Sequence, residues 1–157
     1  MIKVFEPKLS FSDKLAVFSS IMKNEISGSS PIVKTFEENI ANEFDRKYAS
    51  AVSNGSAALD LALQSLNLSD EDEIIIPSFT IISALAAVVR SGGKPIFCDV
   101  DHKTWNMTID NVKGLITNKT KALLLVHTYG LPADASGIEK LCLENNIEVI
   151  EDAAEAH

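Results

Sequence analysis

Five short apolar runs that alternate with helical patterns constrain the fold of this chain more than any other feature. Each run predicts a short buried strand: Ala49 to Ser53, Glu73 to Ile76, Pro95 to Val100, Lys121 to Val126 and Asn146 to Ile150. Strands that alternate with helices form a parallel sheet covered on both faces. We therefore predict an α/β fold with three αβα layers and a mostly parallel sheet.

Apolar residues at helical spacing predict six helices. In the second of these, Ser30 and Pro31 supply an N-cap and a first-turn proline. Val33, Phe36, Ile40 and Phe44 then recur at helical spacing, so we expect one buried face. The expected ranges are Asp13 to Asn24 (with Leu15, Phe18 and Met22 on one side), Pro31 to Asp45, Ser56 to Asn67, Thr80 to Ser91, Ile109 to Ile116 and Asp134 to Asn145.

The composition is that of one folded domain. The chain has 157 residues, of which 46% are hydrophobic and only 6% aromatic, so aliphatic side chains should fill the core. We divide it into an N-terminal arm and helix, residues 1–28, and the N-terminal part of a larger domain, residues 29–157. The last strand needs a covering element after His157, so we expect the chain to be the first part of a longer protein.

Charge and hydropathy exclude several classes of partner. A net charge of -8 opposes non-specific nucleic-acid binding, which needs clustered Lys and Arg. The longest apolar run, residues 81–89, is far shorter than the ~20 residues of a membrane helix, and we expect no membrane partner. Cys98 and Cys142 have neither metal-ligand spacing nor the density of a disulfide scaffold, which favours core packing in a reducing cytosol. We therefore expect a cytoplasmic protein with small-molecule or protein partners and no bound metal.

An acidic residue follows the last predicted strand. Asp152 should emerge at the carboxyl end of residues 146–150, the edge where open α/β sheets bind ligands. A carboxylate there is suited to hold a cationic heterocycle such as a protonated pyridine nitrogen. The alternative is a helix cap or a generic polar contact.

A second candidate site is the turn Ser53-Asn54-Gly55-Ser56, which opens a helix directly after a predicted strand. Free backbone N–H groups and the positive helix end attract anions, Gly55 permits close approach, and the Ser56 hydroxyl adds a donor. An ordinary N-capped helix is the alternative. Because parallel strands bring Ser56 and Asp152 to one edge, a phosphate anchor and a ring-nitrogen anchor together indicate pyridoxal phosphate. Glu155 is placed to contact another ring substituent, or to remain a solvated first-turn residue.

Ordered motifs resemble the DegT/DnrJ/EryC1/StrS sugar aminotransferases. They cover about residues 27–157 and are Ser-Asn-Gly-Ser-Ala-Ala-Leu at 53–59, Pro-Ser-Phe-Thr at 77–80, Gly-Gly-Lys-Pro-Ile-Phe-Cys-Asp-Val-Asp at 92–101, His-Thr-Tyr-Gly-Leu-Pro-Ala-Asp at 127–134 and Glu-Asp-Ala-Ala-Glu-Ala-His at 151–157. The resemblance implies the incomplete large domain of a fold-type I pyridoxal-phosphate transferase. It also implies a homodimer.

The resemblance assigns cofactor contacts to five positions. Gly55 and Ser56 hold the phosphate, Asp152 pairs with the ring nitrogen, and Glu155 takes a position, often Gln, that contacts the ring hydroxyl. Ile81 replaces the aromatic residue that commonly lies on the ring, so the stacking contribution is lost. Glu155, with residues 101–106, resembles the perosamine-synthase branch, which aminates C4 of a nucleotide-linked 4-keto-6-deoxy sugar with glutamate for cell-surface polysaccharide or glycoconjugate biosynthesis.

No catalytic residue is assigned within the chain, because the family's Schiff-base lysine is expected beyond His157. The chain alone should therefore be inactive. His127, Tyr129 and His157 more often serve packing or hydrogen bonding at such positions, and Cys98 lacks the features of a nucleophile. Two other functions remain open: a non-catalytic binding module, and a fold-type I sugar dehydratase that uses His in place of the lysine.

Overall fold

The computed structural model describes residues 6–156 and divides the chain after Ala51 into two compact units. The boundary drawn from the sequence after residue 28 stays a prediction. The first unit holds two helices, α1 (Phe11–Met22) and α2 (Pro31–Glu43). A capping box in which Ser10 and Asp13 exchange hydrogen bonds starts α1. Among the residues described, no helix is long and apolar enough to cross a membrane.

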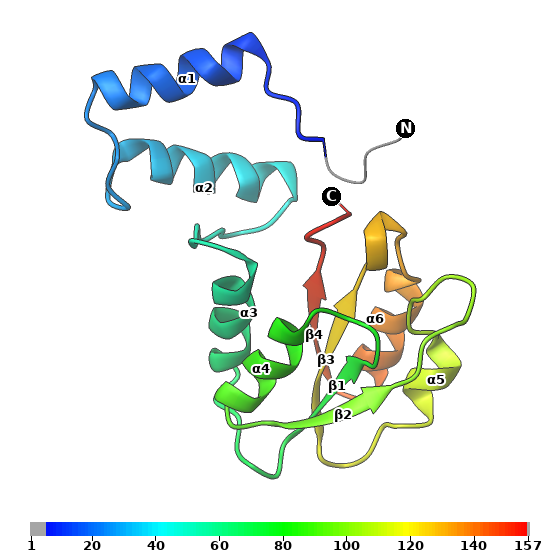
Figure 1. The fold of residues 1–157 in the computed structure, drawn as a ribbon. Helices are drawn as coiled ribbons and strands as arrows, with labels where there is room; N and C mark the ends of the chain where they lie inside the picture. Colours follow the sequence, from blue (N-terminus) through cyan, green and yellow to red (C-terminus); the bar gives the residue numbers. More distant parts are fainter. Residues whose placement is uncertain (1–5, 157) are drawn as a thin grey trace. The chain divides into compact units, whose positions relative to one another are not determined.

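The second unit is a parallel four-stranded sheet with helices on both faces, as predicted (Figure 1). The strand order is β2-β1-β3-β4, so β1 and β3 are central. The strands are β1 (Glu73–Pro77), β2 (Lys94–Cys98), β3 (Thr120–Val126) and β4 (Glu148–Asp152). The helices are α3 (Gly55–Gln64), α4 (Ile82–Arg90), α5 (Ile109–Lys113), the 3-10 helix η1 (Thr128–Gly130) and α6 (Ala135–Glu144).

Side-chain alternation along the central strands divides the core into two layers. Ile74, Ile76 and Leu124 face α3 and α4 and pack with residues such as Leu63. The intervening residues face the other way, where Ile75, Leu123 and Leu125 pack with Val112 of α5 and with Ile138 and Cys142 of α6. Both faces of β1 and β3 are therefore buried, which explains why their sequences are continuously apolar.

The predicted strand Ala49–Ser53 is wrong. Residues 49–53 lie outside the sheet, and Val52 and Ser53 are exposed. Alanine and serine offer little apolar surface to bury, and no strand in the described part of the chain pairs with this segment. In place of the predicted strand, glycine turn and helix, the structure has an irregular segment followed by a helix.

The expected buried face of α2 is also wrong. Within this helix only Ala41 is buried, whereas Phe36 is 54% exposed, and Phe44, just beyond the helix, is 49% exposed. In α1 the residues predicted to share one side are exposed as well, namely Leu15, Phe18 and Met22. The helical spacing was a correct guide to secondary structure here but not to burial within this chain.

Candidate functional site

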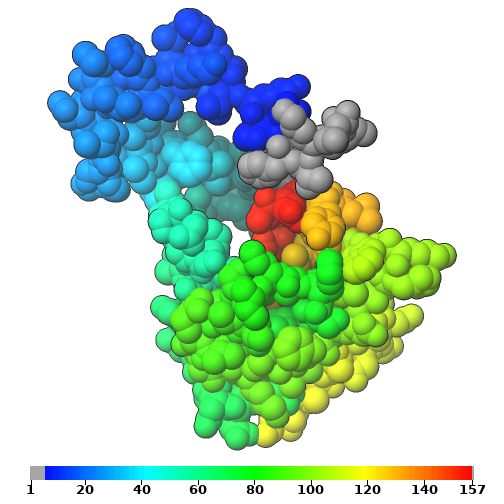
Figure 2. Space-filling view, in the orientation of Figure 1, coloured from blue at the N-terminus to red at the C-terminus, as the bar shows by residue number. Residues whose placement is uncertain are grey.

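A cavity of about 560 Å³ lies at the carboxyl edge of the parallel sheet. Three segments line it: the β1–α4 connection, the end of β3 with η1, and the end of β4 with the turn that follows. Figure 2 shows these segments (green, orange and red) side by side on one face of this unit. The lining residues are Phe79, Thr80, Ile81, Val126, His127, Thr128, Tyr129, Asp152, Ala154 and Glu155. Size and position are those of a small-molecule site in an open α/β sheet.

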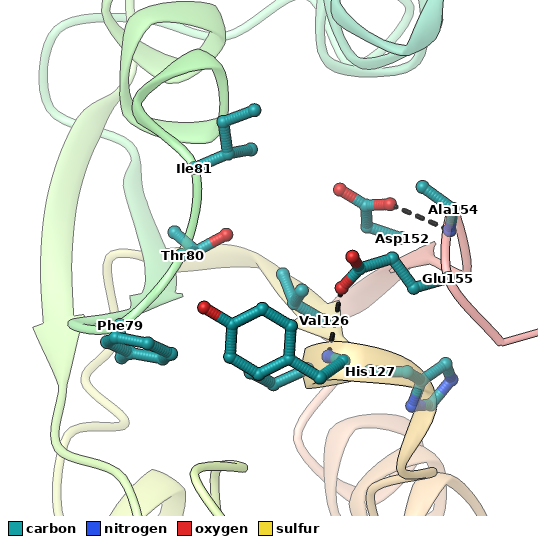
Figure 3. Close-up of a pocket in the computed structure, with 10 residues that line it drawn as sticks. Phe79, Thr80, Ile81, Val126, His127, Asp152, Ala154 and Glu155 are labelled. Carbon is teal, nitrogen blue, oxygen red and sulfur yellow. Dashed lines mark hydrogen bonds between the residues drawn. The ribbon is translucent and has the colours of Figure 1, made fainter. Parts of the chain in front are cut away.

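Asp152 is the last residue of β4 and lines the cavity, which agrees with its predicted place at a strand end. It is half-buried, and its Oδ1 accepts a hydrogen bond from the Ala154 N–H at 3.1 Å. Among the described residues its other carboxylate oxygen has no hydrogen-bond partner. Figure 3 shows Asp152 and Glu155 across the cavity from Thr80 and Ile81. One oxygen thus caps the local turn while the other is free to meet a ligand.

Glu155 joins the β4 end to η1. Its Oε2 accepts the Tyr129 N–H at 2.9 Å, the bond drawn in Figure 3. Tyr129 has a φ of 53° and Gly130 a φ of 79°. A Cβ at residue 130 would lie 2.8 Å from the Glu155 carbonyl oxygen, so only glycine fits there. The 3-10 helix η1 and the turn after β4 therefore hold each other in place. The second carboxylate oxygen of Glu155 remains available to a ligand.

His127 is buried and serves as a hydrogen-bonding residue, as predicted. Its Nε2 lies 2.6 Å from Glu151 Oε1, and its Nδ1 accepts the Ala133 N–H at 3.0 Å. Tyr129 differs, because its side chain is 78% exposed and borders the cavity. His157 lies outside the described residues.

Gly55 and Ser56 begin α3 and do not line this cavity. Asn54 is the N-cap and its Oδ1 accepts the Ala57 N–H at 2.9 Å, so residues 54–55 form a helix start rather than the predicted tight turn. A Cβ on Gly55 would meet no atom within 4 Å. Helix α3 contacts β4 and begins at the edge of the sheet where β4 ends (Figure 1). The two predicted anchors therefore share an edge but not one enclosed pocket.

Thr80 is a lining residue that sequence reasoning missed. Its hydroxyl is the one buried side-chain polar atom without a hydrogen-bond partner in the part of the chain that the structure describes. In Figure 3 this oxygen points toward the cavity. A buried polar atom without a partner is costly, so a ligand or water that bonds to it is favoured. Its place in the connection that follows β1 was the available signal, since the carboxyl ends of β1 and β4 lie at the same edge of the parallel sheet.

Aromatic residues form one border of the cavity. Phe79 lies with its ring centroid 4.6 Å from that of Trp105 and 6.2 Å from that of Tyr129. Ile81, predicted to lie against a ring, is 65% exposed at the cavity. An apolar border beside a few polar groups is typical of a small-molecule site.

Neither cysteine lines the cavity. Burial, with the neighbouring Asp99 carboxylate, raises the pKa of Cys98 to about 11. Burial also raises the pKa of Cys142. Both thiols therefore stay protonated at neutral pH, which agrees with the interpretation that Cys98 is not a nucleophile.

Known proteins resemble the chain over nearly all of its length. GDP-perosamine synthase of Escherichia coli O157:H7 is 41% identical over 155 residues, which cover 99% of this chain and 43% of that protein. The solved aminotransferase from Psychrobacter cryohalolentis aligns with a TM-score of 0.88 and 38% identity, covering 96% of this chain and 38% of that one.

A dehydratase is also similar. The E. coli GDP-4-keto-6-deoxy-D-mannose-3-dehydratase with bound hydrated PLP aligns with a TM-score of 0.86 and 28% identity, over 95% of this chain and 40% of that one. The chain thus spans about two fifths of the length of these relatives. The model of the DegT/DnrJ/EryC1/StrS aminotransferase family matches residues 11–157, and the chain belongs to that family.

Proposed function

We propose that the protein is a pyridoxal-phosphate-dependent aminotransferase that acts on a nucleotide-linked keto sugar. We take the sugar to be a 4-keto-6-deoxy sugar, the amino donor to be glutamate, and the role to be cell-surface polysaccharide or glycoconjugate biosynthesis. The observation that carries the proposal is the free Asp152 oxygen in a cavity at the carboxyl edge of the sheet. Family membership and the similar GDP-perosamine synthases support it.

The residues present fit the aromatic ring of the cofactor. When bound, pyridoxal phosphate supplies an electron sink for charge that develops on the substrate. Asp152 would hold the proton on the ring nitrogen, and the Thr80 hydroxyl would find its missing partner on the ligand. Ile81 would cover the ring, and Glu155 would use its free oxygen toward a ring substituent. Side chains from two of the three lining segments would thereby orient the ring and exclude water.

The phosphate would bind at the start of α3. The Gly55 and Ser56 N–H groups belong to the first turn of this helix, where backbone donors lack intrahelical partners. Among residues 6–156 the Ser56 hydroxyl makes no hydrogen bond, so it is available to a phosphate oxygen. The shared sheet edge supports a ligand that extends from Ser56 to Asp152.

The catalytic lysine is proposed to lie outside this chain. The ten described residues that line the cavity include no lysine. We therefore expect the 157-residue chain to bind the cofactor without turnover. The test is to incubate it with pyridoxal phosphate, glutamate and a 4-keto sugar nucleotide and to follow the aminated sugar. Turnover above that of the free cofactor contradicts this assignment, and failure to bind the cofactor contradicts the proposed function.

A dehydratase is the second candidate, because a solved sugar dehydratase matches this chain with a TM-score of 0.86. The two reactions differ in the product: an aminotransferase leaves nitrogen on the sugar, whereas a dehydratase removes water and leaves none. Product analysis of the chain extended to the length of its relatives separates them. A non-catalytic binding module would give neither product.

We also propose that the protein is a homodimer. The first unit exposes large apolar side chains such as Phe11 at 75% and Phe18 at 61%. Exposed apolar surface of this extent favours association. Sedimentation of the chain over a range of concentrations tests the proposal, and a monomer at high concentration contradicts an interface within residues 1–157.

A further inference from the structure

His127 occupies an unusual place at the border of the cavity. It follows the last residue of β3, yet only 5% of it is exposed, and in Figure 3 its ring points away from the cavity. The roles proposed above for ligand binding do not use it. A buried imidazole with both nitrogens in hydrogen bonds is held in one orientation.

The contacts of the ring determine where its proton lies. The Ala133 backbone N–H can only donate, so Nδ1 of His127 accepts that bond at 3.0 Å. In the neutral ring the hydrogen is then on Nε2, which donates to Glu151 Oε1 at 2.6 Å. The imidazole thus links the loop before α6 to the carboxylate of Glu151.

Glu151 immediately precedes Asp152 in β4, and the two side chains point to opposite faces of the sheet. Asp152 shares its face with Ile150, which packs on the α3 and α4 side. Glu151 shares its face with Val149, which packs on the α5 and α6 side. The bond to His127 therefore holds β4 from the face that the ligand does not occupy.

The backbone of His127 holds Asp152 directly. Val126 pairs with Asp152 in the parallel register, and the His127 N–H donates to the Asp152 carbonyl oxygen at 3.2 Å. His127 thus contacts Asp152 through its backbone and Glu151 through its side chain. Rotation of β4 about its axis would move the Asp152 carboxylate in the cavity, and these two contacts oppose that rotation.

We propose that the His127–Glu151 pair is a positioning device that fixes the Asp152 carboxylate in the cavity. The proposal rests on the function proposed above, in which Asp152 holds a protonated ring nitrogen. His127 touches no reacting group in this arrangement. Its effect is to keep a carboxylate on the opposite face of the strand in the orientation that the ring requires.

Two substitutions at His127 remove the two hydrogen bonds of its imidazole one at a time. His127→Gln places an amide N–H near the position of Nε2, which keeps the donor to Glu151 and removes the acceptor for Ala133. His127→Asn places an amide oxygen near the position of Nδ1, which keeps the acceptor and cannot reach Glu151. Glu151→Ala breaks the same bond as His127→Asn from a residue whose side chain is 35% exposed, so it serves if His127→Asn does not fold.

The probe is pyridoxamine phosphate, labelled with 15N in the ring, bound to the 157-residue chain. This amine form requires no lysine, and the ring-nitrogen chemical shift separates a protonated ring from a neutral one. We expect a protonated signal in the unchanged chain and in His127→Gln. His127→Asn and Glu151→Ala should shift the signal toward the neutral form and weaken binding about tenfold, the loss expected for one poorly oriented hydrogen bond to a charged group.

The comparison with Asp152→Asn distinguishes the two proposals. If Asp152→Asn gives the neutral signal while His127→Asn and Glu151→Ala keep the protonated one, the positioning role is wrong and the proposed function stands. An equal shift in His127→Gln and His127→Asn also overturns the positioning role, because the loss is then one of packing. If the unchanged chain does not bind the probe, or Asp152→Asn leaves its signal unaltered, the proposed function fails and this inference fails with it.

Discussion

The two halves of the candidate site are built in different ways. At the ends of β3 and β4, Tyr129 and Glu155 are joined by a hydrogen bond that spans 26 residues of sequence. At the start of α3, the cap between Asn54 and Ala57 spans only three. The first half is shaped by tertiary contacts before any ligand arrives, whereas the second presents backbone donors on an open helix end. We call the ends of β3 and β4, with Asp152 and Glu155, the ring half of the site, and the start of α3, with Gly55 and Ser56, the phosphate half. We infer that the ring half determines the orientation of the cofactor and that the phosphate half contributes mainly affinity.

The largest expected effect tests the ring half. In the protein extended to the length of its relatives, Asp152→Asn should leave the fold intact and slow the chemical step by about 3 to 4 kcal/mol, because the ring loses the carboxylate that keeps its nitrogen protonated. Single-turnover rates at saturating cofactor measure it.

Asp134→Asn is the matched control for this change. Asp134 Oδ1 accepts the Gly137 N–H at 3.1 Å, as Asp152 Oδ1 accepts the Ala154 N–H at 3.1 Å. Asp134 does not line the cavity, and Asn caps helices about as well as Asp. If both variants keep the full single-turnover rate, Asp152 only caps the turn after β4. The difference between the two halves of the site would then have no role in the reaction.

The contrast between local and distant contacts also explains what the sequence could predict. Short apolar runs that alternate with helical patterns predicted the four observed strands. The signal is strongest for β1 and β3, because burial on both faces requires continuous apolar residues. The segment 49–53 is built mainly from alanine and serine, which offer little apolar surface to bury, and no strand in the described part of the chain pairs with it. Asp152 was placed at a strand end for the same reason that β4 was recognised.

Other features were beyond prediction from the sequence. The hydrogen bonds from His127 to Glu151 and from Tyr129 to Glu155 depend on the order of β3 and β4 in the sheet. The partnerless hydroxyl of Thr80 depends on how β1 and its neighbours enclose it. Each is a consequence of tertiary packing between segments far apart in the chain.

A second prediction tests whether the ring half is locked in advance. Gly130→Ala should destabilise the protein by about 2 to 3 kcal/mol, because residue 130 has a left-handed φ and its new Cβ would lie 2.8 Å from the Glu155 carbonyl oxygen. Gly92→Ala is the control, since Gly92 has a φ of +88° but its nearest contact would be at 3.4 Å. It should cost only the backbone strain, about 1 to 2 kcal/mol.

Urea unfolding of both variants measures this difference. A larger loss for Gly130→Ala means that the two turns hold each other tightly, whereas equal losses mean that the turn after β4 yields to the methyl group. Equal losses would remove the contrast between a preformed ring half and an open phosphate half.

The smallest expected effect tests the phosphate half. Ser56→Ala should weaken cofactor binding by about 1 to 2 kcal/mol, because one hydrogen bond to a charged group is lost while the backbone donors of α3 remain. Ser53→Ala is the control: Ser53 is also exposed and lies just before the helix, but its hydroxyl accepts a hydrogen bond from Asn54 at 3.2 Å. Equilibrium titration with pyridoxal phosphate gives both dissociation constants.

Because the phosphate half is open and the ring half preformed, Ser56→Ala should change the dissociation constant and leave the single-turnover rate at saturating cofactor unchanged. A lower rate at saturation would mean that the start of α3 also orients the ring, and the division of labour between the two halves would be wrong.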